Sequence, residues 1–463
     1  MYNFNKFLKG KKMIEKNKER FGRIGFILAA AGSAVGLGNI WKFPYITGEN
    51  GGGVFVLVYL LTVVLIGMSI FLAEVLIGKK ANSDTVSAFE GLATKGGHIW
   101  KAAGFTIFIG MLILSFYSVV IGWIFHYIVV ALTALPTNMK EAEEAFMTML
   151  QVNWGTQLFY FSLAMFLIAF IISQGVKRGI EKVNLYMMPA MMTILVVMLV
   201  YATTMSGFGQ SLEFLFSPNF EKFNTSSIIV AVGHAFFTLS IGMAVILTYA
   251  SSIGEDTNIV KASLSVVALD TIIALVAGIV IFTITFSSGT EPGKGAGLVF
   301  ITLPALFYEM GTVGSIMAIF FFISLAFAGL TSAISILEPM VMYLENRWDM
   351  TKSKATYGSA FVVYLVGILA LLANTKDFGA ILTIGSKNLF DWFDFLTAAI
   401  LMPLGGIVIA VFVGYFMDKD MVRDEVEPLM GSTFYNLWMI SLRYIVPIAI
   451  TLVLLNETGI WKI

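Results

Sequence analysis

The sequence predicts an all-α protein that crosses a membrane many times. Of its 463 residues, 58% are hydrophobic and only 13% are charged, and the mean hydropathy is +0.86. A soluble domain carries about 25% charged residues, so this chain has too few to cover a surface that faces water. The apolar residues also fall in long runs, such as 54–72, 159–172 and 186–201. These runs approach the length of about 20 residues that a spanning helix needs.

Eleven apolar segments are separated by polar breaks, and each is long enough to span a bilayer. Helices are expected throughout, because a bilayer offers no partner to unpaired backbone groups and no segment alternates like a barrel strand. The predicted spans are 24–46, 54–78, 102–133, 156–174, 180–203, 228–252, 259–287, 313–344, 356–374, 391–417 and 434–456.

The distribution of positive charge predicts the orientation. If the N-terminus is inside, about 21 lysines and arginines lie on the inner side and about six on the outer side, as the positive-inside rule requires. An odd number of spans then places the C-terminus outside. The segment 1–23 is basic and too polar for a signal peptide, so we expect it to be a cytoplasmic N-terminal segment.

Composition also excludes several classes of function. The 29 basic and 29 acidic residues cancel, so no basic surface for nucleic acid is present. The chain has no cysteine, and its three histidines are too scattered for a metal motif. No paired acid and base set points to an enzyme. The lack of cysteine and a short second outer loop favour a prokaryotic plasma (inner) membrane.

The first span is interrupted near its middle. Residues 31–39 (AGSAVGLGN) contain three glycines and a serine, which weaken a helix. A helix that breaks inside the membrane frees carbonyls that can hold a dehydrated cation, and the N-terminus of its outer half favours an anion. The alternative is a glycine face that packs against a neighbouring helix. Both interpretations stay open on this segment alone.

A second interruption lies five spans later, at 233–243 (GHAFFTLSIGM). Two interrupted spans in corresponding positions indicate an inverted-repeat transporter with its site near the middle of the membrane. The repeats would be 24–203 and 228–417, and the eleventh span, 434–456, would lie outside them.

Polar groups inside the other spans add candidates. Thr331, Ser332 and Ser335 form a narrow hydroxyl stripe on one helix face, unless each simply bonds the carbonyl four residues earlier. Charges in the membrane are costly and often functional, and five are present here. Asp270 suits a cation ligand or a proton carrier, whereas buried hydrogen bonds between helices are expected for two glutamates. The five are Lys42, Glu74, Asp270, Glu338 and Asp394, and the two glutamates are Glu74 and Glu338.

Three motifs resemble those of the neurotransmitter:sodium symporter family, in its bacterial amino-acid-transporting branch with the LeuT fold. They are GSAVGLGNIWKFP at 32–44 with ENGGG at 49–53, FFTLS at 236–240 and FAGLTS at 327–332. The resemblance runs from about Arg20 to the end of the chain. It implies a 5+5 inverted repeat in which spans 1 and 6 are unwound.

The resemblance implies two sodium sites. The first would be formed by the substrate carboxylate together with Ala34, Asn39, Thr238 and Asp270. The second would be formed by Gly32, Val35, Ala328, Thr331 and Ser332. A ligand shared between ion and substrate couples their affinities.

It also implies a substrate site for an L-amino acid. The carboxylate would meet the N–H groups of Leu37 and Gly38 and the Tyr117 hydroxyl, and the ammonium would meet carbonyls near Ala34, Phe237 and Thr238. The full set of expected contacts is Ala34, Leu37, Gly38, Ile113, Tyr117, Phe237, Thr238, Ser240, Met243, Ser332 and Ile336. This pocket holds no fixed charge, so a hydrophobic or aromatic side chain is expected. The flexible Met243 favours a large one, such as tyrosine or tryptophan.

The resemblance places an outer gate above this site. Tyr117 and Phe237 would form a lid, Lys42 and Asp394 an ionic gate, and His234 would make a hydrogen bond near that gate. The inner gate departs from the family pattern, because the positions of its arginine–aspartate pair hold Asn17 and Asn346. A pair of Arg20 or Arg23 with Glu345 is the remaining option, and the inner gate stays unassigned.

Two further departures lead to expectations. Animal relatives usually carry Asn where Asp270 stands, and they need chloride. The fixed carboxylate here predicts sodium-coupled uptake that is independent of chloride, with Asp270 taking a proton on the return step.

A twelfth span is absent, which predicts a monomer if that span serves dimer contacts in relatives. Two alternatives of the same fold are a non-transporting amino-acid sensor and an ion-conducting channel.

Overall fold

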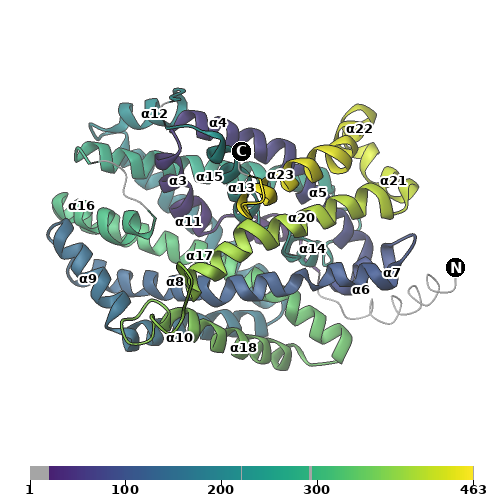
Figure 1. Cartoon of the computed structure of the whole chain (residues 1–463), viewed down its shortest axis with the longest axis horizontal. Helices are drawn as coiled ribbons and strands as arrows, with labels where there is room; N and C mark the ends of the chain where they lie inside the picture. Colours follow the sequence, from purple (N-terminus) through teal and green to yellow (C-terminus); the bar gives the residue numbers. More distant parts are fainter. Residues whose placement is uncertain (1–19, 221, 291–294, 462–463) are drawn as a thin grey trace.

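The computed structural model describes residues 20–220, 222–290 and 295–461. Asn17 and the first 19 residues of the predicted N-terminal segment lie outside this part of the chain. Long helices dominate the described residues and run roughly along the long axis of the molecule (Figure 1). The η elements are π-helical turns that interrupt or extend these helices, except for η3, which is a 3₁₀ turn.

The first predicted repeat, with the short helix that follows it, extends from α2 to α12. Its elements are α2 (Arg23–Ala34), η1 (Gly38–Lys42), α3 (Phe43–Glu49), α4 (Gly53–Thr62), η2 (Val63–Gly67), α5 (Met68–Ala81), α6 (Thr85–Leu92), α7 (Gly97–Trp100), η3 (Lys101–Thr106), α8 (Ile107–Thr133), α9 (Met139–Gln151), α10 (Trp154–Ser173), η4 (Val176–Glu181), α11 (Lys182–Ala202) and α12 (Phe208–Phe216).

The second predicted repeat and the last span extend from α13 to α23. Their elements are α13 (Thr225–Thr238), α14 (Val245–Ala250), α15 (Ile259–Ser287), η5 (Leu298–Thr302), α16 (Leu303–Glu309), α17 (Gly311–Trp348), α18 (Lys352–Leu372), β1 (Thr383–Ile384), β2 (Lys387–Asn388), α19 (Leu389–Phe395), η6 (Leu396–Leu401), α20 (Met402–Val411), η7 (Phe412–Phe416), α21 (Lys419–Met430), α22 (Ser432–Ile440), η8 (Ser441–Ile445) and α23 (Val446–Glu457). The strands β1 and β2 pair antiparallel in a short hairpin.

Each of the eleven predicted spans corresponds to a helix or a broken helix pair. Nine helices in the described residues are long and apolar enough to cross a membrane, and a tenth span consists of α2 and η1–α3, bent by 46°. The predicted sixth span is divided between α13 and α14, and both are shorter than a full span. The interruptions predicted in spans 1 and 6 are therefore confirmed as breaks in the helices.

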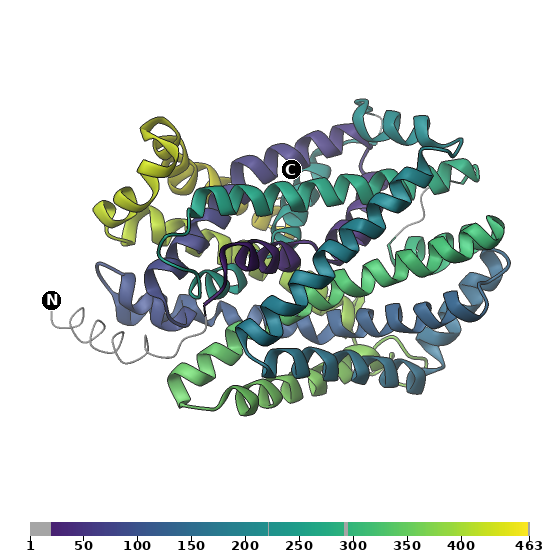
Figure 2. The ribbon, with the colours of Figure 1, turned by 180° about the vertical axis from the view of Figure 1, so that it is seen from behind.

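Polar side chains fix where several of these helices begin. Asn224 caps α13 by accepting from the Ser227 amide at 3.2 Å, and Asn258 caps α15 in the same way from Lys261 at 2.9 Å. Such caps satisfy amides that the first turn of a helix leaves without partners. The broken helix α2 lies near the middle of the bundle, where it packs against α11, α15 and α17 (Figure 2). The longest helix, α17, also contacts α8, α10 and α18.

One polar junction ties α21 to the end of α5. Lys79 donates to Glu425 at 2.7 Å and to the Thr257 carbonyl at 2.9 Å, and Lys80 also pairs with Glu425. Burial raises the pKa of the Glu425 carboxyl, but hydrogen bonds from both lysines outweigh it and hold that pKa below its usual value. A lowered folded-state pKa stabilises the fold at neutral pH, and this contribution fades as the pH falls below about 4.5.

We therefore expect Glu425→Gln to lower the unfolding temperature by about 1–2 °C at pH 7, as a partly exposed ion pair contributes about 0.5–1 kcal/mol. The difference should shrink as the pH falls below about 4.5 and through the lowered folded-state pKa of Glu425, so it should be smaller at pH 4 than at pH 7 and smallest at pH 3. Thermal unfolding of the purified protein in detergent at these pH values measures this. A difference that stays constant down to pH 3 would contradict the assigned cause.

Candidate substrate and sodium site

The break after α2 is held open by side chains from other helices. The amide of Gly36 donates to Asn39 Oδ1 at 3.1 Å, and the amide of Leu37 donates to the Tyr117 hydroxyl at 3.2 Å. A Cβ on Gly36 would lie 2.6 Å from Ser332 Oγ and 2.9 Å from the Tyr117 hydroxyl, so only glycine fits there. Because these amides point away from helical partners, the break exposes backbone donors inside the bundle.

The break between α13 and α14 has an irregular backbone. Ser240, Gly242 and Ala244 have φ values of +53°, +84° and +69°, which residues other than glycine rarely adopt. The Glu74 carboxyl on α5 stabilises this stretch by accepting from the Gly242 amide at 2.7 Å and from the Leu247 amide at 3.3 Å. The structural role expected for Glu74 is therefore confirmed.

Asp270 lies at the centre of a buried polar cluster that joins both breaks. Asn39 Nδ2 donates to its Oδ1 at 2.8 Å and to its main-chain carbonyl at 3.0 Å. Thr238 Oγ1 donates to the two carboxylate oxygens at 3.0 and 3.2 Å. None of the three side chains is exposed. The three side chains predicted for the first sodium site thus come together, and their oxygens are the ligand type that a hard cation prefers.

A second group of oxygens lies where α17 crosses α2. Ser332 Oγ donates to the carbonyls of Gly32 at 3.2 Å and of Ser33 at 3.1 Å. Thr331 instead bonds within its own helix, to the carbonyls of Phe327 at 2.9 Å and of Ala328 at 3.1 Å. The two hydroxyls of the predicted stripe therefore behave differently. Ser332 bonds across to α2, whereas Thr331 bonds carbonyls of its own helix, which was the alternative interpretation.

A small cavity of about 20 Å³ lies between the two breaks. Its lining includes nine of the eleven predicted substrate contacts, and the two others, Leu37 and Thr238, bond to Tyr117 and to Asp270 respectively. The nine are Ala34, Gly38, Ile113, Tyr117, Phe237, Ser240, Met243, Ser332 and Ile336. Ser33 and Gly36 also line the cavity, although they are not among the predicted contacts. Val35 is fully buried beside them in the unwound segment.

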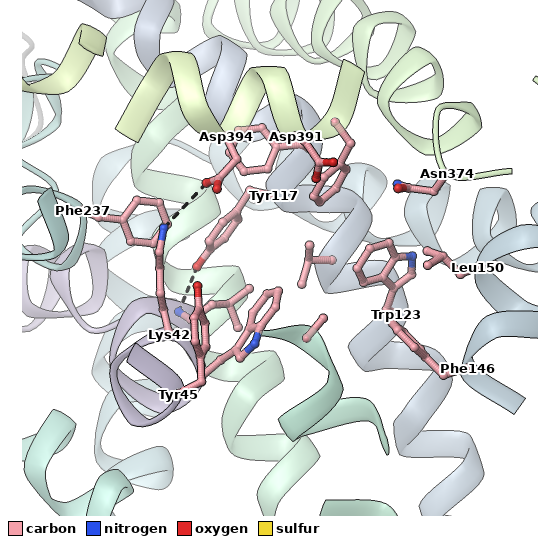
Figure 3. A pocket seen from close by; sticks show the side chains of 16 residues that line it. Lys42, Tyr45, Tyr117, Trp123, Phe146, Leu150, Phe237, Asn374, Asp391 and Asp394 are labelled. Carbon is pink, nitrogen blue, oxygen red and sulfur yellow. Dashed lines mark hydrogen bonds and ion pairs between the residues drawn. The ribbon is translucent and has the colours of Figure 1, made fainter. Parts of the chain in front are cut away.

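A larger cavity of about 270 Å³ lies next to it. Figure 3 draws the side chains that line this larger cavity. Tyr117 and Phe237 line both cavities and so separate them. Lys42 Nζ is 3.8 Å from Asp394 Oδ1 and 4.7 Å from the centroid of the Phe237 ring. The four residues predicted for the lid and the ionic gate thus surround this cavity.

His234 does not make the gate hydrogen bond that we expected. Its ring is 2% exposed and packs against Phe43 at 5.9 Å and Tyr59 at 5.3 Å. Among the described residues, neither of its ring nitrogens has a hydrogen-bond partner. The expected hydrogen bond is absent among the described residues because the ring packs against aromatic side chains of α3 and α4, although it lines a cavity together with Lys42 of the ionic gate.

Comparison with known proteins identifies the family. A model described as the sodium:neurotransmitter symporter family matches residues 18–153 and 137–461. This chain belongs to that family. This symporter is 34% identical to the uncharacterized sodium-dependent transporter YhdH of Bacillus subtilis, over 95% of this chain and 97% of that one. It is 31% identical to an uncharacterized sodium-dependent transporter of Haemophilus influenzae, over 96% and 100%.

A solved structure supports the fold of this symporter. The crystal structure of MhsT in complex with L-phenylalanine is 40% identical and superposes with a TM-score of 0.87, covering 95% of this chain and all of that one. The predicted LeuT fold is therefore confirmed. The relatives are sodium-dependent transporters, so sodium is the ion that the oxygen clusters are expected to hold.

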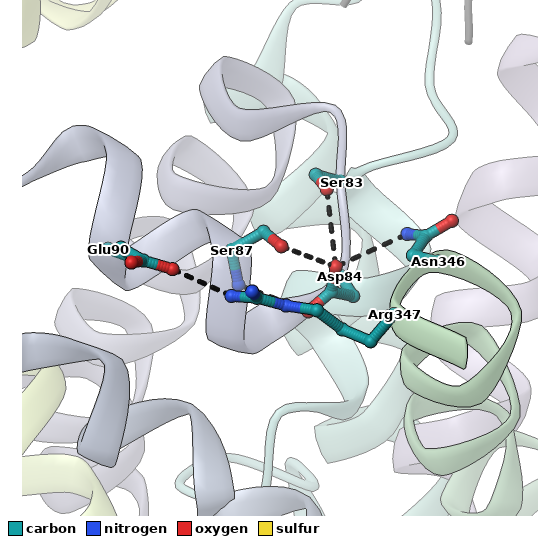
Figure 4. A network of polar contacts seen from close by, with 6 residues as sticks. All are labelled: Ser83, Asp84, Ser87, Glu90, Asn346 and Arg347. Atoms are coloured by element: carbon teal, nitrogen blue, oxygen red, sulfur yellow. Dashed lines mark hydrogen bonds and ion pairs between the residues drawn. The ribbon is translucent and has the colours of Figure 1, made fainter. Parts of the chain in front are cut away.

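The end of the bundle at which α17 ends carries contacts that the sequence did not predict. Asn346 at the end of α17 donates to Asp84 at 3.4 Å, and Arg347 pairs with Glu90 of α6 at 2.7 Å (Figure 4). Asp84 also caps α6 by accepting from the amide and the hydroxyl of Ser87.

A pair of Arg20 or Arg23 with Glu345 is not present among the described residues. Glu345 pairs with Lys352 at 3.2 Å, and Lys352 also pairs with the buried Glu338 at 2.5 Å. Lys352 is the first residue of α18, which follows α17 after a short turn. Its side chain therefore lies closer to Glu345 than the residues at the start of α2 do.

Proposed function

We propose that this symporter imports a hydrophobic or aromatic L-amino acid together with sodium, by alternating access. The observation that carries the proposal is the small apolar cavity between two broken helices, with Asp270 bonded to both breaks. The L-phenylalanine bound to MhsT supports the same class of cargo, since the two chains are 40% identical over nearly their whole lengths.

In this proposal the unwound segment of the first span holds the main-chain end of the amino acid. The substrate carboxylate accepts from the N–H groups of Leu37 and Gly38 and from the Tyr117 hydroxyl, which already lies within 3.2 Å of the Leu37 amide. The ammonium donates to carbonyls of the two breaks near Ala34, Phe237 and Thr238. Binding at both breaks ties the two repeats together around the cargo.

The walls of the cavity select the side chain. Ile113, Met243 and Ile336 are each buried and apolar, and none of the described residues that line the cavity is charged. A charged side chain would lose its hydration there without gaining a partner. Met243 can change its rotamer to admit a large ring, so we expect aromatic cargo to bind best.

Two sodium ions couple to transport in this proposal. The first would lie beside Asp270, with oxygens from Ala34, Asn39 and Thr238 and from the substrate carboxylate. The second would lie at the crossing of α2 and α17, with oxygens of Gly32, Val35, Ala328, Thr331 and Ser332. When bound, each ion supplies positive charge that neutralises buried oxygens. The Asp270 carboxylate supplies fixed negative charge, which makes chloride unnecessary.

Binding to the purified protein tests this proposal. We expect sodium-dependent binding of L-phenylalanine, L-tyrosine, L-tryptophan and L-leucine in detergent, at least tenfold stronger than in potassium at equal ionic strength. L-glutamate and L-lysine serve as negative controls, because their side chains carry charge. Equal binding in sodium and potassium would refute the coupling, and no binding in either salt would refute the amino-acid cargo.

A further inference from the structure

A buried carboxamide on α11 has an oxygen without a partner. Asn184 is fully buried, and its Nδ2 donates to the Ile180 carbonyl at 2.8 Å. That bond fixes the orientation of the amide, because only the NH₂ group can donate to a carbonyl. Its Oδ1 therefore points the other way, and among the described residues no group donates to it. A buried acceptor without a donor destabilises the folded state by about 1–3 kcal/mol, so most such atoms in proteins have a partner.

This oxygen lies against the break in α2. If Gly32 carried a Cβ, that atom would collide with Asn184 Oδ1 and would lie 3.2 Å from Thr331 Cβ. Three helices, α2, α11 and α17, therefore meet at Gly32, and α11 contacts both of the others. Gly32 and Thr331 are two of the five residues proposed for the second sodium site. The absence of a side chain at Gly32 is what lets the carboxamide approach.

We propose that Asn184 Oδ1 is a further ligand for the cation at the second sodium site, contributed by a helix from which no other ligand comes. This inference rests on the proposed function, because it presupposes a sodium ion at the crossing of α2 and α17. A hard monovalent cation takes oxygen ligands, and an amide oxygen is a good neutral one. A cation bound at this site would give Asn184 Oδ1 a partner and would link α11 to α2 and α17.

The test is the sodium dependence of thermal stability, measured on the purified protein in detergent without amino acid. Sodium chloride is titrated against potassium chloride at constant ionic strength. For Asn184→Ala we expect at least a fivefold rise in the sodium concentration that gives half of the maximal stabilisation. Asn184→Asp keeps an oxygen at this place, so its half-saturating sodium concentration should stay within about twofold of the parent or fall.

Gln157→Ala provides a matched control. Gln157 is also a buried carboxamide, but its oxygen accepts from the Trp123 indole at 2.9 Å and its amide donates to the carbonyls of Met149 and Leu150. Its removal should lower the unfolding temperature in potassium without changing the half-saturating sodium concentration. Such a result separates a loss of packing from a loss of ion binding.

Two results would overturn the inference. If the parent responds to sodium and Asn184→Ala has the same half-saturating concentration, Asn184 is not a ligand, and the proposed function is unaffected. If the parent itself is not stabilised by sodium, the second sodium site and the inference fail together.

Discussion

Asp270→Asn is expected to abolish amino-acid uptake in chloride-free buffer or to make it dependent on chloride. The substitution keeps the size of the side chain and leaves Asn39 and Thr238 in place, so its main effect is the loss of one buried negative charge. Removing one partner of the proposed pair between this carboxylate and sodium costs about 3–5 kcal/mol, which corresponds to about 10²–10⁴ in affinity. Uptake of radiolabelled L-phenylalanine into proteoliposomes, with gluconate replacing chloride, measures the effect.

The control is Asp391→Asn, which removes the same charge from the lining of the larger cavity. We expect this variant to keep uptake within about threefold of the parent in both buffers, because Asp391 is not among the hydrogen-bond partners of the buried cluster in the described part of the chain. Normal chloride-free uptake by Asp270→Asn would show that the carboxylate is not the source of negative charge for the first sodium site.

Glu74→Ala is expected to destabilise the protein by about 3–5 kcal/mol, because it leaves the buried amides of Gly242 and Leu247 without an acceptor. The strained stretch between α13 and α14 would then lose the contact that fixes it. The unfolding temperature in detergent and the yield of monodisperse protein report the loss.

Glu74→Gln provides the comparison for this effect. Its carboxamide oxygen can still accept from the Gly242 amide, so we expect less than half of the loss seen for Glu74→Ala. If Glu74→Ala unfolds at the temperature of the parent, the carboxyl does not hold the break in place.

The spans and both breaks could be predicted from the sequence because the features that produce them are local. Long apolar runs predict spanning helices, and the glycines of 31–39 predict the first break. The backbone conformation at the second break could be predicted only in part. Ser240 and Ala244 have positive φ although neither is glycine, and no local pattern indicates this. Contacts from Glu74, 168 positions away from Gly242, stabilise that backbone.

The residues of the site were predicted from the motifs, from the charge of Asp270 inside a span and from the family resemblance, and Asn184 carries none of these signals. Asn184 lies in an ordinary apolar span, and its position beside Gly32 follows only from the packing of α11 on α2. The contacts between the end of α17 and α6 were missed for a similar reason, since Asp84 and Asn346 are 262 positions apart. The hydrogen bond predicted for His234 was wrong because helix spacing gives the distance to Thr238 but not which neighbours the ring faces.

The length of α17 has a mechanical consequence. This helix of 38 residues spans about 57 Å and carries Thr331 and Ser332 near its middle and Asn346 and Arg347 near its C-terminal end. The distance along the axis between these two groups is about 22 Å, so a tilt of about 5° at Thr331 would displace the C-terminal end by about 2 Å. A shift of that size is enough to break the 2.7 Å contact between Arg347 and Glu90. In the proposed mechanism, α17 would therefore couple a small rearrangement at the second sodium site to the release of α6.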